Sequence, residues 1–348
     1  MSEQQQDPQR READARRPRE EGQAQREAPF PQDQTHREAD LSKVRTVPVA
    51  SRANKVDARD FAKPPAVDVS FTAFLNSLPH ILEARSFSAV VDAIVNAKRN
   101  GRGVFCFLGG HVVKTGLAPL FIELMQRGVI THLSSNGSAV IHDYEMARWG
   151  GTSEDVEAGL TDGSFGMASE TGAEMNRAIR EGAQNNLGLG ESLMHALARR
   201  SDNAYPDLSL LLAAHRYNVP FTVHAALGAE IIHQHPDADG GAIGQTSFTD
   251  FKRLAARLPD LEGGVVLNIG SAVIMPEVFL KALTISRNLN NGHPREFTAA
   301  DFDMLRQYRP RMNVVERPTR TGGGRGYQIT GHHEIMIPLL TWSVLSRL

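Results

Sequence analysis

From about residue 70 onward, the chain alternates short apolar runs with amphipathic segments. Runs rich in β-branched and aromatic residues predict strands, and apolar residues spaced three and four apart predict helices. Predicted strands cover residues 104–108, 129–133, 219–224, 264–269 and 312–316. Predicted helices include residues 88–98, 117–126, 139–148, 206–217, 249–258, 276–288 and 334–345. This alternation predicts an α/β fold, a Rossmann-like doubly wound and mostly parallel sheet with helices on both faces.

The N-terminal segment has a different composition. No Val, Ile or Leu occurs before Leu41, so this stretch cannot bury enough apolar surface to offset the entropy of ordering it. We expect residues 1–50 to form a disordered, charged and Gln-rich arm. Residues 51–69, which contain FAKPPAV, are expected to be a linker or an N-terminal arm, and residues 70–348 a single α/β domain.

Composition narrows the classes of protein to consider. A formal net charge of -2 provides no general basic field, which disfavours nonspecific binding to nucleic acids. The sequence shows no apolar run long enough for a membrane span, and a single cysteine, Cys106, cannot form an internal disulfide. We therefore expect a cytoplasmic protein without a membrane partner. Cys106 lies between Phe105 and Phe107 and is expected to be a buried apolar residue.

The first predicted strand ends in the turn GGHVVKTG, which carries candidate chemistry. Gly109 and Gly110 allow a ligand to approach the backbone closely, and Lys114 adds a positive charge beside His111. The segment matches neither the Walker loop nor the G-x-G-x-x-G fingerprint. A phosphate site and a structural turn both remain open for it.

The pentapeptide GSAVI occurs twice, at residues 137–141 and 270–274, each time after a predicted strand. Ser138 or Ser271 can cap the following helix and direct backbone donors to a ligand. Polar, glycine-bearing ends on three strands suggest a phosphate-containing ligand such as a dinucleotide. Two similar helix starts that serve packing alone would give the same repeat.

The stretch SSNGSAVIHDYE carries the densest set of polar groups. Asp143 could begin a helix, or it could bind a ribose hydroxyl or a cationic amine. His142 and Glu145 lie on the same two helical turns. The following residues 152–166 are typical of a loop that lines a site, although a capped helix at Ser153 followed by a DG turn also explains them.

Histidines form another candidate group. His224 ends a predicted strand, where it would serve as a general base or as a core residue. A metal-dependent hydrolase could use further histidines, although no HExxH or Cys/His finger spacing is present. These further histidines are His233, His235, His332 and His333. A serine hydrolase is disfavoured because neither turn serine has the G-x-S-x-G setting. The run TGGGRG at residues 321–326 could clamp an anion or form a flexible loop.

Four segments, taken in order, resemble the deoxyhypusine synthase family. They are FLGGHVVKTGLAPLFIELMQRGVITHLSSNGSAVIHDYE, VPFTVHAALGAEI, GGVVLNIGSAVIMPEVFLKAL and EIMIPLLTWSVL. The order and spacing of several turns carry the resemblance, which extends from about residue 70 to the C-terminus. It implies an NAD-binding Rossmann-like fold in a homotetramer with sites at dimer interfaces. In that family, NAD oxidises spermidine, and a lysine captures the aminobutyl unit before its transfer to an acceptor amine.

The resemblance also suggests residues for each role. The acidic residues Asp143, Glu145 and Glu230 would hold a cationic amine. The expected cofactor-binding residues are Gly110, Thr115, Gly116, Asn136, Gly137, Ser138, Gly270 and Ser271.

The chain lacks several residues that carry out the chemistry of the family. The region TGGGRGYQITGHHE contains no lysine where the family has its imine-forming lysine, and no lysine follows Lys281. The family's histidine pair after the fourth strand is replaced by Met275, Pro276 and Glu277. Lys114 is the only lysine in a predicted site turn, so a covalent route would have to use it.

The leading hypothesis is an NAD-dependent transferase that acts on an amine or polyamine such as spermidine, with Lys114 as nucleophile and His224 or His111 moving the proton. The alternatives are an NAD-dependent amine or alcohol dehydrogenase without transfer, a metal-dependent hydrolase built on the histidines, and a noncatalytic ligand-binding protein.

Overall fold

The computed structural model describes residues 38–64 and 67–348. The chain divides after Lys55 into two units. In the described part of the first unit, residues 38–55 form two short 3-10 turns, Leu41–Lys43 and Val49–Ser51, and every side chain is exposed. The predicted disorder falls mainly on residues 1–37, which lie outside the described residues, and the boundaries placed at residues 50 and 69 stay predictions.

The second unit contains a sheet of six parallel strands, in the order β3-β2-β1-β4-β5-β6. The chain runs from the central β1 outward to β3 and then returns to β4 beside β1, so the winding direction reverses between β1 and β4. The strands are β1 (Val104–Leu108), β2 (His132–Asn136), β3 (Phe221–His224), β4 (Val265–Ile269), β5 (Thr298–Asp303) and β6 (Arg325–Thr330). The predicted Rossmann-like doubly wound α/β fold is thereby confirmed.

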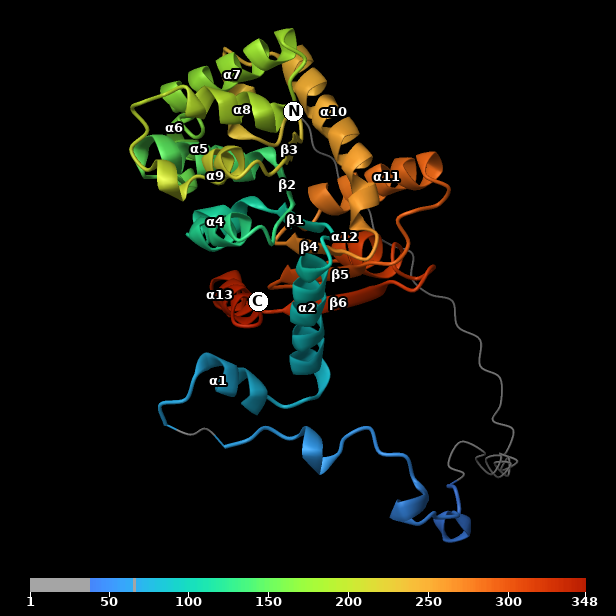
Figure 1. Cartoon of the computed structure of the whole chain (residues 1–348). Helices are drawn as coiled ribbons and strands as arrows, with labels where there is room; N and C mark the ends of the chain where they lie inside the picture. The colour runs from blue at the N-terminus through green and yellow to red at the C-terminus, as the bar shows by residue number, and fades with distance from the viewer. Residues whose placement is uncertain (1–37, 65–66) are drawn as a thin grey trace, which may run out of the picture. The chain divides into compact units, whose positions relative to one another are not determined.

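Helices connect the strands in the described part of the second unit, and Figure 1 shows them on both sides of the sheet. The helices before β3 are α1 (Phe71–Ser77), α2 (Leu82–Arg99), α3 (Gly110–Lys114), α4 (Ala118–Gln126), α5 (Gly137–Trp149), α6 (Val156–Asp162), α7 (Ser169–Gln184), α8 (Leu189–Ala198) and α9 (Leu210–Arg216). After β3 come α10 (Gly240–Arg257), α11 (Ile274–Leu289), α12 (Tyr308–Pro310), the π-helical η8 (Arg311–Glu316) and α13 (His333–Leu345).

Side chains of β1 alternate between two buried cores. Val104, Cys106 and Leu108 pack into the larger core, to which α2, α4, α5 and α13 contribute. Phe105 and Phe107 point to the opposite face and join a smaller core with residues of α10 and α11. Burial on both faces explains why this strand reads as a continuous apolar run, and Cys106 is buried as predicted.

Several predicted elements shift or change type. The predicted strand 312–316 is wrong, because its residues form the π-helical turn η8. The strand predicted at residues 129–133 runs from His132 to Asn136, since its polar HLSSN sequence is largely buried against both neighbouring strands. The sequence analysis did not predict β5 and β6, whose TAADFD and RGYQIT sequences lack a long apolar run.

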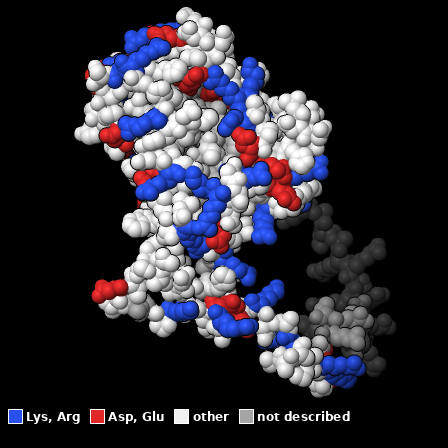
Figure 2. Space-filling model, in the orientation of Figure 1, with Lys and Arg blue, Asp and Glu red and all other residues white. Residues whose placement is uncertain are grey.

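Charged side chains of both signs are distributed over the face drawn in Figure 2, with lysine and arginine interrupted by aspartate and glutamate. Within the described residues, no helix combines the length and the apolar character that a bilayer crossing requires.

Candidate functional site

The reversal point between β1 and β4 lies where open α/β sheets place their ligands. Here the backbones touch: a Cβ atom on Gly109 would lie 2.0 Å from the carbonyl oxygen of Gly270. The Gly109 N–H donates to Ile269 O at 3.0 Å, so the pairing continues past the end of β1. Gly109 is needed for this close approach, because any side chain there would collide with the backbone of Gly270.

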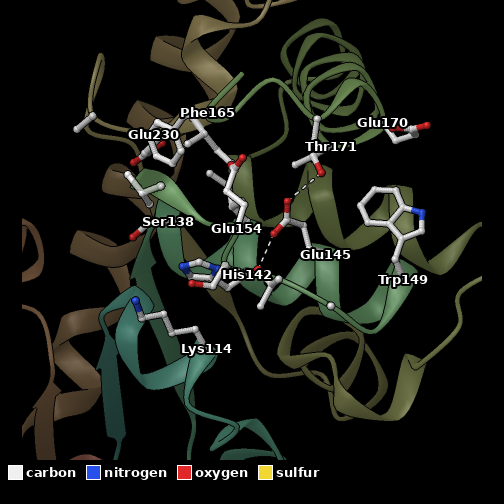
Figure 3. A pocket seen from close by; sticks show the side chains of 18 residues that line it. Lys114, Ser138, His142, Glu145, Trp149, Glu154, Phe165, Glu170, Thr171 and Glu230 are labelled. Carbon is white, nitrogen blue, oxygen red and sulfur yellow. Dashed lines mark hydrogen bonds between the residues drawn. The ribbon is translucent and has the colours of Figure 1, made fainter. Parts of the chain in front are cut away.

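A cavity of about 740 Å³ opens beside the carboxyl end of β2 and the first turns of α5. Figure 3 shows that its side chains come from α3, α5, the segment before α6, and α7. Four carboxyl groups and two aromatic rings line the cavity together with Lys114: Glu145, Glu154, Glu170, Glu230, Trp149 and Phe165. This combination of negative charge and aromatic surface suits a cationic ligand.

Glu230 is buried against the first turn of α5. Its Oε1 accepts the N–H of Gly137 at 3.1 Å and the N–H of Ala226 at 2.9 Å. Burial raises the pKa of Glu230 to about 7, although the two N–H bonds act in the opposite direction. This internal carboxyl group takes the position at the start of α5 where the sequence led us to expect a cofactor phosphate.

Glu145 is the centre of a chain of hydrogen bonds along the cavity wall. Thr152 Oγ1 donates to Glu145 Oε2 at 2.5 Å, and Thr171 Oγ1 donates to Glu145 Oε1 at 2.9 Å. Thr152 Oγ1 also lies 2.8 Å from His142 Nδ1. Figure 3 shows both bonds to Glu145 and places His142 next to them.

Sequence reasoning did not select His142, Thr152 or Thr171 as site residues. His142 and Glu145 are three residues apart on a predicted helix, and this spacing places both on one face. Thr152 begins the segment 152–166 that the sequence indicated as a possible site-lining loop, whereas no sequence pattern pointed to Thr171, which α7 brings to Glu145.

Lys114 is exposed at the edge of the cavity, and Figure 3 shows its side chain pointing towards Ser138 at the start of α5. The structure therefore brings together Lys114, Ser138, Glu145 and Glu230 from the predicted set. Gly110 lies behind them: a Cβ atom there would be 2.8 Å from Ser138 Oγ.

Asp143 does not face the cavity, which corrects its predicted role in substrate binding. Its buried carboxylate accepts hydrogen bonds from Ser209 Oγ at 2.8 Å, Leu210 N at 2.6 Å and Leu211 N at 3.0 Å. These groups form the N-terminus of α9, so Asp143 fastens α9 to α5. Burial raises its pKa to about 6, against the effect of the three bonds.

His224 also lies away from the cavity. Nε2 of its buried ring lies 3.2 Å from Thr222 Oγ1, and Thr222 Oγ1 lies 2.7 Å from Ser134 Oγ. Burial lowers the pKa of His224 to about 3. The structure places it in a buried polar network between β2 and β3, away from the cavity where a base would act.

His111 lies on the other side of the β1 turn. Its ring centroid is 5.6 Å from that of the buried His333, whose Nε2 is 3.1 Å from Phe302 O. Burial lowers the pKa of His111, and the neighbouring His333 and Lys114 contribute. His111 therefore faces β5 and α13, whereas the cavity lies towards α5.

The remaining predicted cofactor residues are spread over three turns. Thr115 Oγ1 donates to His111 O at 2.9 Å, and Gly116 follows with a left-handed φ of 82°. Asn136 caps α5, because its Oδ1 accepts the N–H of Ala139 at 3.3 Å.

The two GSAVI segments fold differently. Helix α5 begins at Gly137, the first residue of its copy, whereas α11 begins only at Ile274. In the second copy Gly270 adopts a left-handed φ of 65°, and the buried Ser271 Oγ accepts the N–H of Met275 at 3.2 Å. The identical pentapeptides therefore expose different backbone groups.

Within residues 38–64 and 67–348, no three His, Cys, Asp or Glu side chains lie close enough together to hold a metal ion. The metal site hypothesised from the histidines finds no support in that part of the chain.

No protein-family profile matches the sequence, and a comparison with curated proteins found no match either. Solved structures are similar in fold. A protein from Entamoeba histolytica assigned as a deoxyhypusine synthase is 11% identical, with 80% of this chain and 94% of that chain covered and a TM-score of 0.48.

A protein from Methanococcus maripaludis S2 assigned to the LOR/SDH type is 14% identical, with coverages of 82% and 74% and a TM-score of 0.45. The protein AgrE, solved with ornithine and NAD+, is 14% identical, with a TM-score of 0.46 over 75% of this chain and 33% of that chain. This chain thus spans about a third of the length of AgrE. The likeness concerns the fold and does not extend to activity.

Proposed function

We propose that this protein is an NAD-dependent enzyme that acts on a cationic amine or polyamine, such as spermidine. The observation that carries the proposal is the cavity beside the carboxyl end of β2, which four carboxyl groups and one lysine line together. An ammonium group gains from nearby carboxylates, and aromatic rings add cation–π attraction.

We place the dinucleotide at the reversal point between β1 and β4, where open α/β sheets bind their ligands. The buried Asn268 Oδ1 near the end of β4 has no hydrogen-bond partner among the described residues and supports this placement. The turn at Gly110 with the hydroxyls of Ser138 and Ser271 would hold the cofactor. When bound, NAD supplies a hydride acceptor next to the amine cavity.

Transfer of an aminobutyl group to an acceptor amine is the finer form of this proposal. Oxidation of the carbon beside the substrate nitrogen leaves an iminium carbon, which a lysine amine can attack. Lys114 lines the cavity and is the candidate for this step. Lys281 is paired with Glu277 on the exposed side of α11 and does not line the cavity.

A dehydrogenase that releases its oxidised product is the second candidate. The region 321–334 contains no lysine, and this observation favours the candidate. The two activities differ in the fate of the hydride, since a transferase returns it to the product before release whereas a dehydrogenase accumulates NADH.

Calorimetric titration with NAD, in the absence and presence of spermidine, tests the binding step. We expect NAD to bind, and to bind more tightly with spermidine present. Absorbance of NADH during turnover then separates the two activities. Absence of NAD binding under both conditions would overturn the proposal.

A matched pair of double variants tests the role of the carboxylates. Glu154→Gln with Glu170→Gln removes two cavity charges, whereas Glu157→Gln with Glu181→Gln removes two exposed charges outside the cavity. We expect the first variant to bind spermidine about 3- to 10-fold more weakly, because each exposed ion pair contributes modestly to affinity. The second variant should bind spermidine like the wild type. Equal effects in both variants would count against the cavity.

A further inference from the structure

The hydroxyl groups of Thr152 and Thr171 occupy both oxygens of Glu145, at 2.5 and 2.9 Å. An ionised carboxylate only accepts hydrogen bonds, and a hydroxyl carries a single hydrogen. Thr152 therefore donates its one hydrogen to Glu145. Its oxygen can still accept hydrogen bonds but has no further hydrogen to donate.

One such bond comes from His142, whose Nδ1 lies 2.8 Å from Thr152 Oγ1. Because the threonine oxygen can only accept here, Nδ1 must carry the hydrogen. In a neutral imidazole with hydrogen on Nδ1, Nε2 holds a free lone pair. The chain from Glu145 through Thr152 thus sets the tautomer of His142.

The Nε2 edge of His142 is directed away from Thr152, towards the turn after β1. A Cβ atom on Gly110 would lie 3.4 Å from His142 Cδ2, the atom next to Nε2, and 2.8 Å from Ser138 Oγ. The edge that carries the lone pair therefore faces the turn proposed for the cofactor, and His142 lines the amine cavity.

Neighbouring groups keep the ring neutral. Burial lowers the pKa of His142, and the positive charge of Lys114 on α3 adds to the effect. The carboxyl groups that line the same cavity are those of Glu145 on α5, Glu154 before α6, Glu170 on α7 and Glu230 after β3.

We propose that His142 is the proton acceptor of this site and that Glu145 and Thr152 are its positioning residues. The inference rests on the proposed function and deepens it. The ammonium group of the substrate gives its proton to His142 Nε2, and the freed nitrogen lone pair forms the C=N bond as the adjacent carbon loses its hydride to NAD+. The amine is oxidised to an iminium ion, and NAD+ is reduced to NADH.

The assignment changes the role of Glu145. Both of its oxygens accept threonine hydroxyls, and in this assignment Glu145 orients His142 through Thr152. Glu154 and Glu170 are the more exposed carboxylates of the cavity, and we assign them to bind the amine.

Nitrogen-15 NMR of the histidine rings tests the tautomer without any substrate. The His142→Gln spectrum identifies the His142 resonances. We expect hydrogen on Nδ1 in the wild type and in Thr152→Ser, and a shift towards hydrogen on Nε2 in Thr152→Val. Thr161→Val, on the exposed face of α6, is the matched control and should leave the tautomer unchanged. A wild-type ring with hydrogen on Nε2 would overturn the proposal.

Kinetics with NAD and spermidine test the proton transfer. We expect His142→Gln to reduce kcat by about 10²- to 10⁴-fold with little change in KM, the range of general base catalysis. Thr152→Val should also lose kcat, and Thr152→Ser should recover most of it. The low-pH limb of the kcat/KM profile should be absent in His142→Gln.

Two outcomes separate this inference from the proposed function. A wild-type protein that binds neither NAD nor amine in the calorimeter would overturn both. Binding of both ligands with unchanged turnover in His142→Gln would overturn the role of His142 alone, and the proposed function would stand.

Discussion

The Glu230 carboxyl group accepts a hydrogen bond from the backbone N–H of Gly137, the first residue of α5, at 3.1 Å. Helix N-termini attract negative charge, and in this chain an internal carboxyl group from the segment after β3 meets that preference. The same contact places Glu230 among the residues that line the cavity. Fold stability and the charge of the candidate site therefore depend on one pair of residues.

Gly137→Ala is expected to destabilise the protein by about 1–3 kcal/mol, because the new Cβ atom would lie 2.0 Å from Glu230 Oε2 and force the carboxyl group to move. Urea denaturation measures the free energy of unfolding. Gly244→Ala in α10, where the Cβ atom would meet open space, should instead stabilise by about 0.5–1 kcal/mol. A Gly137→Ala protein as stable as the wild type would contradict the geometry.

Asp143→Asn is expected to lower the free energy of unfolding by about 2–4 kcal/mol, because an amide replaces a buried carboxylate that accepts three hydrogen bonds. Asp155→Asn, at the exposed cap of α6, is the control and should have little effect, since Asn caps helices as well as Asp. Calorimetry with spermidine should show unchanged affinity in both folded variants. Selective loss of spermidine binding in Asp143→Asn would restore the substrate role predicted from sequence.

Asp250 should make stability depend on pH. Burial raises its pKa to about 7, although it accepts the N–H groups of Gly190 and Val223. Between pH 3.8, the ordinary pKa of an aspartate side chain, and about pH 7, the folded state binds more protons than the unfolded state. The contribution of Asp250 to the free energy of unfolding therefore falls as pH rises through this window.

Urea denaturation of the wild type and Asp250→Asn at several pH values measures this contribution. The wild-type advantage over Asp250→Asn should shrink from about pH 4 to about pH 7 and then stay constant. The exposed Asp207→Asn variant controls for the substitution itself. An advantage that grows with pH would show that the carboxylate is ionised in the fold.

Cys106 should react with a thiol reagent only in the unfolded protein. Its side chain is buried in the centre of β1, and burial raises the pKa of the thiol. Ellman's reagent should therefore label native protein at the rate of unfolding, and label protein in urea at once. Rapid labelling of native protein would contradict the burial.

The local sequence pattern was sufficient to predict those strands and helices whose apolar residues are the buried ones. Residues 104–108 were predicted as a strand and form β1 with the same bounds, and the helix predicted at residues 117–126 begins one residue later as α4. Polar strands gave no such pattern: Asp301 in β5 is buried and hydrogen-bonded to Asn268 in β4, a contact that no local periodicity reports.

By itself, the sequence determined the α/β class and the places where glycine-bearing turns follow strands, because burial periodicity and turn chemistry act over a few neighbouring residues. Tertiary structure decided what each turn does. The two identical GSAVI segments adopt different conformations. One follows Asn136, which caps α5, and the other begins at Gly270, whose backbone packs against Gly109. Likewise, Asp143 and Glu145 are two residues apart on α5 but have different surroundings. Asp143 is buried against α9 and anchors that helix, whereas Glu145 contacts α7 and lines the cavity. Both partner helices are distant in sequence, so only tertiary packing decides the difference.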